Sequence, residues 1–287
     1  MKRWLSLYRE ALVPIYGERE ADSVYRLALE HVTGKPRLEI MMDTGLFLSN
    51  EQEASLAAIL DRLLKHEPIQ YIIGETEFYG LRMKVGPGVL IPRGETEELV
   101  EWVLRTKGWY YEGKSIENKV LRVLDIGCGS GAIAIALAKN MPEAEVYAAD
   151  ISDSALEFTR SNARLNEVSV STFYLDILNP DPCLLSLDVI VSNPPYVAEW
   201  DRAAMARNVL DYEPHVALFA PGEDPLVFYR AISGFAAGHL VPGGSVYVEI
   251  NEGIGEKTAE IFRGCFKNVE LRKDINGKDR MIRATNG

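Results

Sequence analysis

The chain has 287 residues, of which 47% are hydrophobic and 25% are charged, the mix of an ordinary globular protein that buries a sizeable core. This composition excludes collagen-like and extensively disordered chains, and the length predicts one large domain or two of unequal size. The net charge of −11 argues against an enzyme that holds nucleic acid through many phosphate contacts, because those require clustered cationic side chains. A protein or a small molecule is therefore the favoured substrate, and no direct binding of nucleic acid is expected.

Cysteine usage and hydropathy bear on where the protein works. No apolar stretch is long enough to span a bilayer, and no secretory signal is recognisable. Cys128, Cys183 and Cys265 lie far apart, and neither they nor the four histidines have the spacing of metal ligands. We therefore expect a protein of the reducing cytoplasm that binds no membrane and no metal, and we expect it to act as a monomer.

Residues 1–65 carry apolar positions at helical spacing, which predicts three or more amphipathic helices. The first series is Trp4, Tyr8, Leu12 and Ile15. Gly34 and Pro36 are expected to end the second helix, and Ser49 with Gln52 predicts a capping box for the helix that stops before Pro68. Such stripes usually form a core, so residues 1–75 are predicted to be a small helical domain.

A change of periodicity follows this region. Alternating apolar residues from Glu77, the turn residues Gly86-Pro87-Gly88 and an apolar run at 89–91 predict a linking β-hairpin in residues 76–92. In residues 93–287 short β-rich runs alternate with helical windows, which predicts an α/β fold with a doubly wound, mostly parallel sheet. The strand candidates are 120–126, 145–149, 170–174, 187–191 and 245–250.

A glycine-rich turn follows the first of these strands. The run 123–126 leads into Gly127-Cys128-Gly129-Ser130-Gly131, and a helix is expected to begin near Ala132. Glycines at the carboxyl edge of an open α/β sheet let the backbone approach a ligand. Gly127, Gly129 and Ala132 also match a dinucleotide-binding pattern, although a tight strand-to-helix turn alone explains the glycines equally well.

Two aspartates follow the next two strands. Asp150 lies 19 residues beyond Gly131, at the position where a carboxylate accepts both hydroxyls of a ribose. The alternative is that Asp150, or Asp153 in its place, caps the following helix. Asp176 follows the third strand in the same way, and there a solvated loop aspartate is an equally good interpretation.

The most specific motif is Asn193-Pro194-Pro195-Tyr196, directly after the fourth strand. Two consecutive prolines fix an extended backbone without N–H donors, so carbonyl oxygens and the Asn193 side chain remain to accept hydrogen bonds. Acceptors that hold both hydrogens of a planar NH2 group would favour an attacking geometry at its nitrogen. Tyr196 can stack on such a planar group. Asn-Pro-Pro is also ordinary turn chemistry, but its place in this sheet favours a functional role.

Together these motifs resemble those of class I S-adenosylmethionine-dependent methyltransferases that act on planar NH2 groups. Further segments resemble the HemK-type release-factor glutamine methyltransferases over nearly the whole chain, the helical domain included. These segments are 70–74, 78–80, 91–97, 212–214, 217–218 and 276–280. Within them Gly94 stands where the family usually has proline, which loosens that loop, and Pro225 replaces a common glycine.

The resemblance implies a seven-stranded sheet and transfer of a methyl group from S-adenosylmethionine, which leaves S-adenosylhomocysteine. The acceptor would be the N5 amide nitrogen of the glutamine in the Gly-Gly-Gln motif of class-1 peptide chain release factors. The helical domain would dock the release factor. No covalent intermediate is needed, so Cys128 is interpreted as a small space-filling residue.

The resemblance also implies roles for individual residues. Gly127, Cys128, Gly129, Ser130 and Gly131 would hold the methionine end of the cofactor, Asp150 its ribose, and Asp176 with Ile177 the edge of its adenine. Asn193, Pro194, Pro195 and Tyr196 would seat the glutamine amide, with Asn193 also bordering the cofactor. Arg93 and Glu97 would border the substrate, although a salt bridge at a helix start explains them equally well.

Other functions stay open at this point. A glutamine methyltransferase that acts on a ribosomal protein shares the same motifs, and a nucleic-acid amino methyltransferase would use them on a flipped base. A nicotinamide-dependent dehydrogenase would explain the glycine turn and Asp150 but not residues 193–196. A catalytically silent binding scaffold is the last alternative. No dedicated general base is evident, and Glu249 and Glu252 are either proton acceptors or structural residues.

Overall fold

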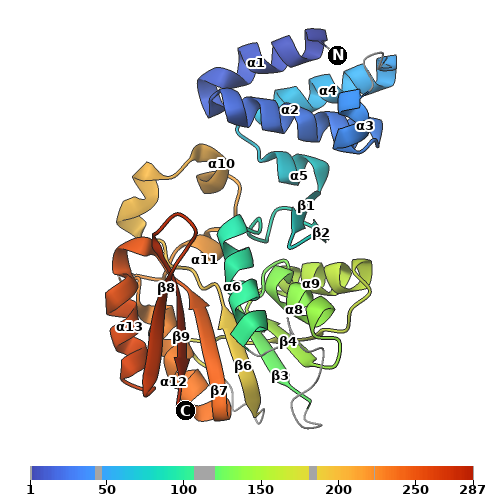
Figure 1. Cartoon of the computed structure of the whole chain (residues 1–287). Helices are drawn as coiled ribbons and strands as arrows, with labels where there is room; N and C mark the ends of the chain where they lie inside the picture. The colour runs from blue at the N-terminus through green and yellow to red at the C-terminus, as the bar shows by residue number, and fades with distance from the viewer. Residues whose placement is uncertain (1, 43–46, 107–119, 181–185, 223, 287) are drawn as a thin grey trace. The chain divides into compact units, whose positions relative to one another are not determined.

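The computed structural model describes residues 2–42, 47–106, 120–180, 186–222 and 224–286 (Figure 1), so Cys183 lies outside the described residues. The chain divides into two compact units. The helical unit comprises residues 1–75 and 206–212, and the α/β unit comprises residues 76–205 and 213–287. The segment 206–212, which lies far along the chain, thus groups with the N-terminal helices, an arrangement that the sequence did not indicate.

The helical unit contains α1 (Lys2–Tyr16), α2 (Glu18–Thr33), α3 (Arg37–Met42), α4 (Asn50–Leu63), α5 (Ile69–Ile73) and α10 (Arg207–Leu210). The apolar stripes predicted from the sequence form its core, which includes Tyr8, Leu12 and Leu56. The capping box of Ser49 and Gln52 is confirmed. Tyr212 attaches the late segment, because its hydroxyl donates to the Lys65 carbonyl oxygen at 2.8 Å.

The β-hairpin is present, but its predicted position is wrong. It consists of β1 (Glu75–Phe78) and β2 (Leu81–Lys84), joined at Tyr79 and Gly80, which have φ angles of 51° and 72°. Two consecutive residues with positive φ match the twist of paired strands, so this turn closes the hairpin earlier than predicted. Residues 86–91 form no strand, and the Ile91 N–H donates instead to Glu213 Oε2 at 3.1 Å.

The α/β unit is built on a seven-stranded sheet in the order β5-β4-β3-β6-β7-β9-β8. The strands are β3 (Arg122–Ile126), β4 (Glu145–Asp150), β5 (Ser171–Tyr174), β6 (Leu187–Ser192), β7 (Leu240–Glu249), β8 (Asn268–Lys273) and β9 (Asp279–Thr285). The first five in the order are parallel, and β9 runs antiparallel to both of its neighbours. All five predicted strands and the doubly wound fold class are confirmed, and β8 and β9 are added to them.

Helices cover both faces of this sheet. On one face α6 (Gly94–Thr106), α8 (Ala132–Asn140) and α9 (Asp153–Leu165) pack on strand residues such as Val123 and Val189. On the other face α12 (Val227–His239) and α13 (Gly255–Arg263) pack on Leu124 and Ile190. This alternation along each strand is the period of two that places successive side chains on opposite faces.

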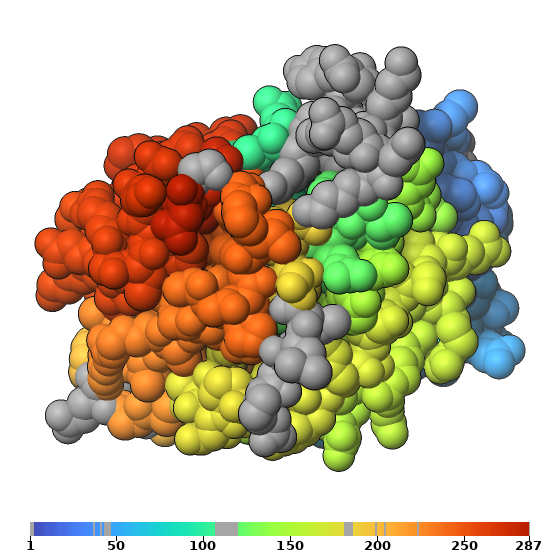
Figure 2. All heavy atoms as spheres, turned by 90° about the horizontal axis from the view of Figure 1, so that it is seen from below, coloured from blue at the N-terminus to red at the C-terminus, as the bar shows by residue number. Residues whose placement is uncertain are grey.

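Short elements complete the α/β unit: η2 (Glu199–Ala204), α11 (His215–Leu218) and η3 (Glu252–Ile254). Figure 2 shows the elements from β3 to β5, in green and yellow-green, at one side of the unit and the C-terminal elements, in orange and red, at the other, as the strand order requires. Among the residues described, no helix is both long and apolar enough to cross a bilayer.

Candidate active site

The predicted site residues follow one row of register partners that crosses four parallel strands. The row consists of Ala149, Ile126, Ser192 and Val248. The residues directly after it are Asp150, Gly127, Asn193 and Glu249. The strand order reverses at β3, which has β4 on one side and β6 on the other. Ligands of open α/β sheets bind at the carboxyl ends of the strands at such a switch point.

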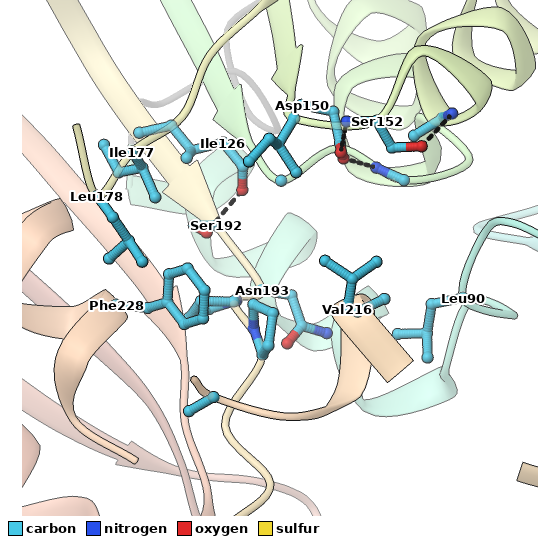
Figure 3. Close-up of a pocket in the computed structure, with 18 of the residues that line it drawn as sticks. Leu90, Ile126, Asp150, Ser152, Ile177, Leu178, Ser192, Asn193, Val216 and Phe228 are labelled. Atoms are coloured by element: carbon cyan, nitrogen blue, oxygen red, sulfur yellow. Dashed lines mark hydrogen bonds between the residues drawn. The ribbon is translucent and has the colours of Figure 1, made fainter. Parts of the chain in front are cut away.

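A cavity of about 680 Å³ lies at this edge of the sheet, within the size range of small-molecule and cofactor sites. Gly127, Gly129, Asp150, Asp176, Ile177 and Asn193 all line it. Figure 3 shows Asp150 and Asn193 on opposite sides of the cavity, with Phe228 toward one end and Leu90 toward the other. Leu90 belongs to the run that was predicted as a strand, and in the structure this run forms part of the cavity wall.

The glycine-rich turn is held by the neighbouring strand. The N–H groups of Gly127 and Cys128 both donate to the Ala149 carbonyl oxygen, at 2.8 and 3.1 Å. Gly131 has a φ angle of 81°, and a Cβ atom there would lie 2.8 Å from Cγ2 of Thr159. This glycine is required by backbone conformation and by close packing. The turn therefore needs its glycines for its own geometry as well as for access to the cavity.

Cys128, Ser130 and Gly131 do not line the cavity, although they lie between residues that approach it. Cys128 is buried, and its Sγ lies 3.4 Å from Thr159 Oγ1. Burial raises the pKa of this thiol well above its ordinary value. A protonated, enclosed thiol is a poor nucleophile, and its environment supports the interpretation of Cys128 as a space-filling residue.

Asp150 is held by backbone N–H groups. Its Oδ2 accepts from the Gly129 N–H and its Oδ1 from the Ser152 N–H, both at 2.9 Å. The alternative role of Asp150 or Asp153 as a helix cap is wrong. Ser152 is the N-cap of α9, and its side chain accepts from the Ala155 N–H. An ionised carboxylate has about four acceptor sites, so Asp150 retains capacity for further donors from the cavity.

Asp176 lies in the loop after β5, where it is partly buried and accepts two hydrogen bonds. Its Oδ1 accepts from the Leu178 N–H and its Oδ2 from Asn179 Nδ2, both at 3.0 Å. The side chain is partly buried and lines the cavity next to Ile177. A carboxylate and an apolar side chain thus adjoin each other at the cavity wall.

Residues 193–196 border the cavity from the end of β6. Asn193, Pro194 and Pro195 line it, whereas Tyr196 is not among the lining residues. Asn193 Nδ2 donates to Thr96 Oγ1 at 3.2 Å. The Tyr196 hydroxyl donates to Glu249 Oε1 at 3.2 Å, and burial, the largest cause, raises the pKa of Tyr196. The structure therefore shows Tyr196 hydrogen-bonded to Glu249, whereas its stacking on a substrate stays a prediction.

Arg93 and Glu97 do not form a salt bridge with each other. Arg93 pairs with the buried Glu213, with 2.5 Å between the guanidinium Nη2 and Oε1. Glu97 accepts from the Tyr79 N–H in the hairpin turn at 2.7 Å. Neither Arg93 nor Glu97 lines the cavity, so both support the segments around the site from outside it.

Thr96 and Glu213 have structural roles that the sequence did not predict. Both lie inside segments that carry the family resemblance, 91–97 and 212–214, and this was the available signal. Glu213 accepts from the Ile91 N–H and from Arg93. It thereby fastens the chain next to the cavity-lining run 88–90.

Asp125 is a buried carboxyl group in β3, just before the glycine-rich turn. Its Oδ2 accepts from the Ala134 N–H at 3.1 Å, and its Oδ1 is buried without a partner. Burial raises the pKa of Asp125 from 3.8 to about 7, with the charge of Asp150 adding to the rise and the Ala134 hydrogen bond opposing it. Because the pKa is raised on folding, ionisation of Asp125 destabilises the folded state progressively as the pH rises from 3.8 to about 7.

We therefore expect Asp125→Asn to gain stability relative to wild type over this pH interval and to show a constant difference above it. Thermal unfolding of both proteins in a pH series measures the difference in Tm, in which the contributions of titrating groups that do not interact with Asp125 cancel. If the difference in Tm does not change with pH, ionisation of the buried Asp125 carboxyl does not destabilise the folded state, and the prediction is wrong.

Comparison with known proteins places the chain in a family. A model of the methyltransferase small domain matches residues 114–233, and a model of the PrmC N-terminal domain matches residues 3–74. The chain is 43% identical to a release factor glutamine methyltransferase of Flavobacterium psychrophilum, over 99% of the chain and 98% of the relative. It is 42% identical to one of Bacteroides thetaiotaomicron, over 99% of each.

Solved structures show the same fold. A 16S rRNA methyltransferase of T. thermophilus, solved with AdoMet and guanosine, has a TM-score of 0.53 at 20% identity and covers 74% of this chain and 50% of its own. The hMettl16 catalytic domain, solved with an RNA hairpin, has a TM-score of 0.55 at 16% identity and covers 74% and 76%. With its full-length relatives and its site at the switch point of a seven-stranded sheet, the chain belongs to the family of release factor glutamine methyltransferases.

Proposed function

We propose that this protein transfers a methyl group from S-adenosylmethionine to the N5 amide nitrogen of the glutamine in the Gly-Gly-Gln motif of class-1 peptide chain release factors. One observation carries the proposal. The acceptor-rich turn 193–195 lines the same cavity as the glycine turn and Asp150. The position for an NH2 group and the position for an adenosyl cofactor therefore adjoin each other.

The cavity fits the cofactor in size and chemistry. Asp150 has acceptor capacity for the ribose hydroxyls, and Asp176 with Ile177 offers an acceptor and an apolar surface for the adenine edge. Gly127 and Gly129 line the wall without side chains, where the methionine end would lie. Bound there, S-adenosylmethionine supplies a methyl group on a positively charged sulfur that is open to direct displacement.

The residues of the chain orient the nucleophile. The Asn193 side chain and the Pro194 carbonyl oxygen would accept the two hydrogens of the glutamine amide and so orient its nitrogen as the attacking atom. Glu252 pairs with Lys278 at 2.7 Å, and Glu249 is bonded to two hydroxyls and does not line the cavity. We therefore infer that the proton of the amide leaves to solvent and not to either carboxylate.

Intact-mass analysis tests the proposed reaction. The purified protein is incubated with S-adenosylmethionine and a release factor, either wild type or with its loop glutamine replaced by alanine. We expect a gain of one methyl group on the wild-type factor only, because the alanine variant has no amide nitrogen at that position.

Two other outcomes would contradict the proposal. A methyl group on the alanine variant would move the target to another residue. No methyl group on either factor, with binding of S-adenosylmethionine confirmed by calorimetry, would withdraw the release factor as substrate. The next substrates to test would then be ribosomal proteins and structured RNA.

We further propose that the helical unit docks the release factor. It carries large apolar side chains in exposed positions, namely Leu38, Met42 and Phe47, with exposed fractions of 69%, 74% and 92%. Exposed apolar surface often marks a site of protein–protein contact when it forms a continuous patch. The proposed catalytic residues lie in the α/β unit, so these exposed side chains have no part in the proposed chemistry.

Substitution of Leu38 and Phe47 by serine is expected to raise KM for the intact release factor several-fold and to leave kcat unchanged, because only ground-state binding is lost. KM for a short Gly-Gly-Gln peptide should stay the same. Val120→Ser, which changes an exposed apolar residue two positions before β3 in the other unit, is the matched control. An unchanged KM for the intact factor, or an equal rise with the peptide, would refute docking at these residues.

A further inference from the structure

Thr96 and Glu249 form a buried polar pair behind the turn 193–196. Their exposed fractions are 5% and 1%, and they come from α6 and from the end of β7. Thr96 Oγ1 lies 2.6 Å from Glu249 Oε2. Such a short, buried contact between a hydroxyl and a carboxylate is a charge-assisted hydrogen bond.

Both ends of this pair continue to the proposed substrate-binding turn. Asn193 Nδ2 lies 3.2 Å from Thr96 Oγ1, and the Tyr196 hydroxyl lies 3.2 Å from Glu249 Oε1. The first and last residues of the turn are therefore joined through a chain of three hydrogen bonds. Neither Thr96 nor Glu249 lines the cavity, so they act on the turn from behind.

The direction of each hydrogen bond follows from the number of protons available. Burial raises the pKa of Glu249, but the hydrogen bonds from Thr96 and Tyr196 and the charge of Arg280 oppose that rise, while Glu95 adds to it. As a carboxylate, Glu249 satisfies both hydroxyls by accepting from each. The Thr96 hydroxyl has a single proton, and once this proton is donated to Glu249 its oxygen can only accept from Asn193.

This requirement decides which way the Asn193 amide faces. The two ends of an asparagine amide have nearly the same shape, but one end donates and the other accepts. Thr96 takes the NH2 end, so the Oδ1 end is left to accept from a ligand. The reversed amide would present its own NH2 group to the NH2 group of a substrate, and the hydrogen bond would be lost.

We propose that Thr96 is a positioning residue that fixes the orientation of the Asn193 amide. Because Thr96 donates its proton to Glu249, it accepts from the NH2 end of Asn193, and Asn193 Oδ1 is left to accept a hydrogen from the glutamine NH2 group. The inference rests on the proposed function of the turn. It adds a specificity element, because the same orientation would reject a substrate that offers an acceptor at this point. Glu249 then serves to orient a hydroxyl proton, and it does not remove a proton from the substrate.

The test compares Thr96→Val, which has the shape of threonine without the hydroxyl, with Thr96→Ser, which keeps the hydroxyl. We expect the valine variant to lower kcat for glutamine methylation about 10- to 100-fold, because misplacement of a positioned group costs up to about 100-fold. The serine variant should stay close to the wild-type kcat, because its hydroxyl has the same donor and acceptor capacity. The Kd for S-adenosylmethionine and the Tm should be close to wild type in Thr96→Ser.

A double-mutant cycle separates positioning from general structural support. If Thr96 acts through Asn193, then Thr96→Val should cause no further loss of single-turnover rate in an Asn193→Ala background. An equal loss in both backgrounds, or wild-type kcat in Thr96→Val, would overturn the proposal. Thr96→Ala, which also lacks the hydroxyl, replaces the valine variant if valine prevents folding.

A second readout needs no substrate, so that failure of this inference can be told apart from failure of the proposed function. The side-chain amide signal of Asn193 in a nitrogen-proton NMR spectrum is identified by its absence in Asn193→Ala. Its hydrogens should exchange slowly with solvent in wild type and Thr96→Ser and faster in Thr96→Val. Equal exchange rates in wild type, Thr96→Ser and Thr96→Val would overturn the inference. Slow exchange in a wild-type protein that methylates no glutamine would contradict only the proposed function.

Discussion

Replacement of Asn193 by alanine is expected to lower kcat for glutamine methylation by about 100- to 1,000-fold, the range for loss of one preorganised hydrogen-bonding group at a reacting centre. Asn193 lines the cavity, and its amide is already fixed by Thr96 before any substrate binds. The Kd for S-adenosylmethionine should change by less than about threefold, because removal of one acceptor from the nucleophile side leaves the ribose and adenine contacts in place.

The measurement is single-turnover methylation of a Gly-Gly-Gln peptide, with calorimetric titration of S-adenosylmethionine alongside. Asn140→Ala is the matched control, since the Asn140 amide donates to the Ala136 carbonyl oxygen within α8 and does not line the cavity. Turnover by Asn193→Ala at the wild-type rate would remove Asn193 from the chemistry. A large loss of cofactor affinity would assign it to the cofactor and not to the glutamine.

Replacement of Asp150 by alanine is expected to weaken binding of S-adenosylmethionine about 10- to 100-fold, which corresponds to about 1.5–3 kcal/mol for hydrogen bonds to a charged group. Two effects act together. The ribose hydroxyls lose their proposed acceptor, and the N–H groups of Gly129 and Ser152 lose the carboxylate that orders the turn. Asp150→Asn keeps an acceptor and should lie between wild type and the alanine variant.

Calorimetry gives the Kd for each variant. The control is Asp153→Ala, an exposed acidic residue in the first turn of α9, close in sequence to Asp150 but not among the residues that line the cavity. A wild-type Kd in Asp150→Ala would remove the carboxylate from the cofactor site. An equal loss in Asp153→Ala would show that local charge near the helix start, and not the specific contact, sets the affinity.

Much of the site could be predicted because it lies where strands end. Hydrophobic strands are recognisable in the sequence, and parallel strands bring their carboxyl ends to one edge. Gly127, Asp150 and Asn193 each follow a strand directly, and the register places the residues before them in one row. The sheet therefore gathers residues that the sequence shows only as isolated motifs.

The parts that were missed depend on partners that are distant in sequence. Thr96 and Glu249 are 153 positions apart, and nothing in the periodicity around either residue indicates the other. A buried polar side chain needs a hydrogen-bond partner, because leaving it without one costs free energy. Burial alone does not show which residue that partner is. The hairpin was misplaced for a local reason, since Tyr79 with positive φ is a less evident turn residue than Gly86 or Gly88.

The grouping of residues 206–212 with the N-terminal helices means that the backbone passes between the two units three times. An exchange of recognition modules between such enzymes would have to transplant two separated pieces of sequence. A transplant of residues 1–75 alone would leave Tyr212 without the Lys65 carbonyl oxygen that it binds. Recombination at residue 75 would therefore transfer a helical unit that lacks its segment 206–212.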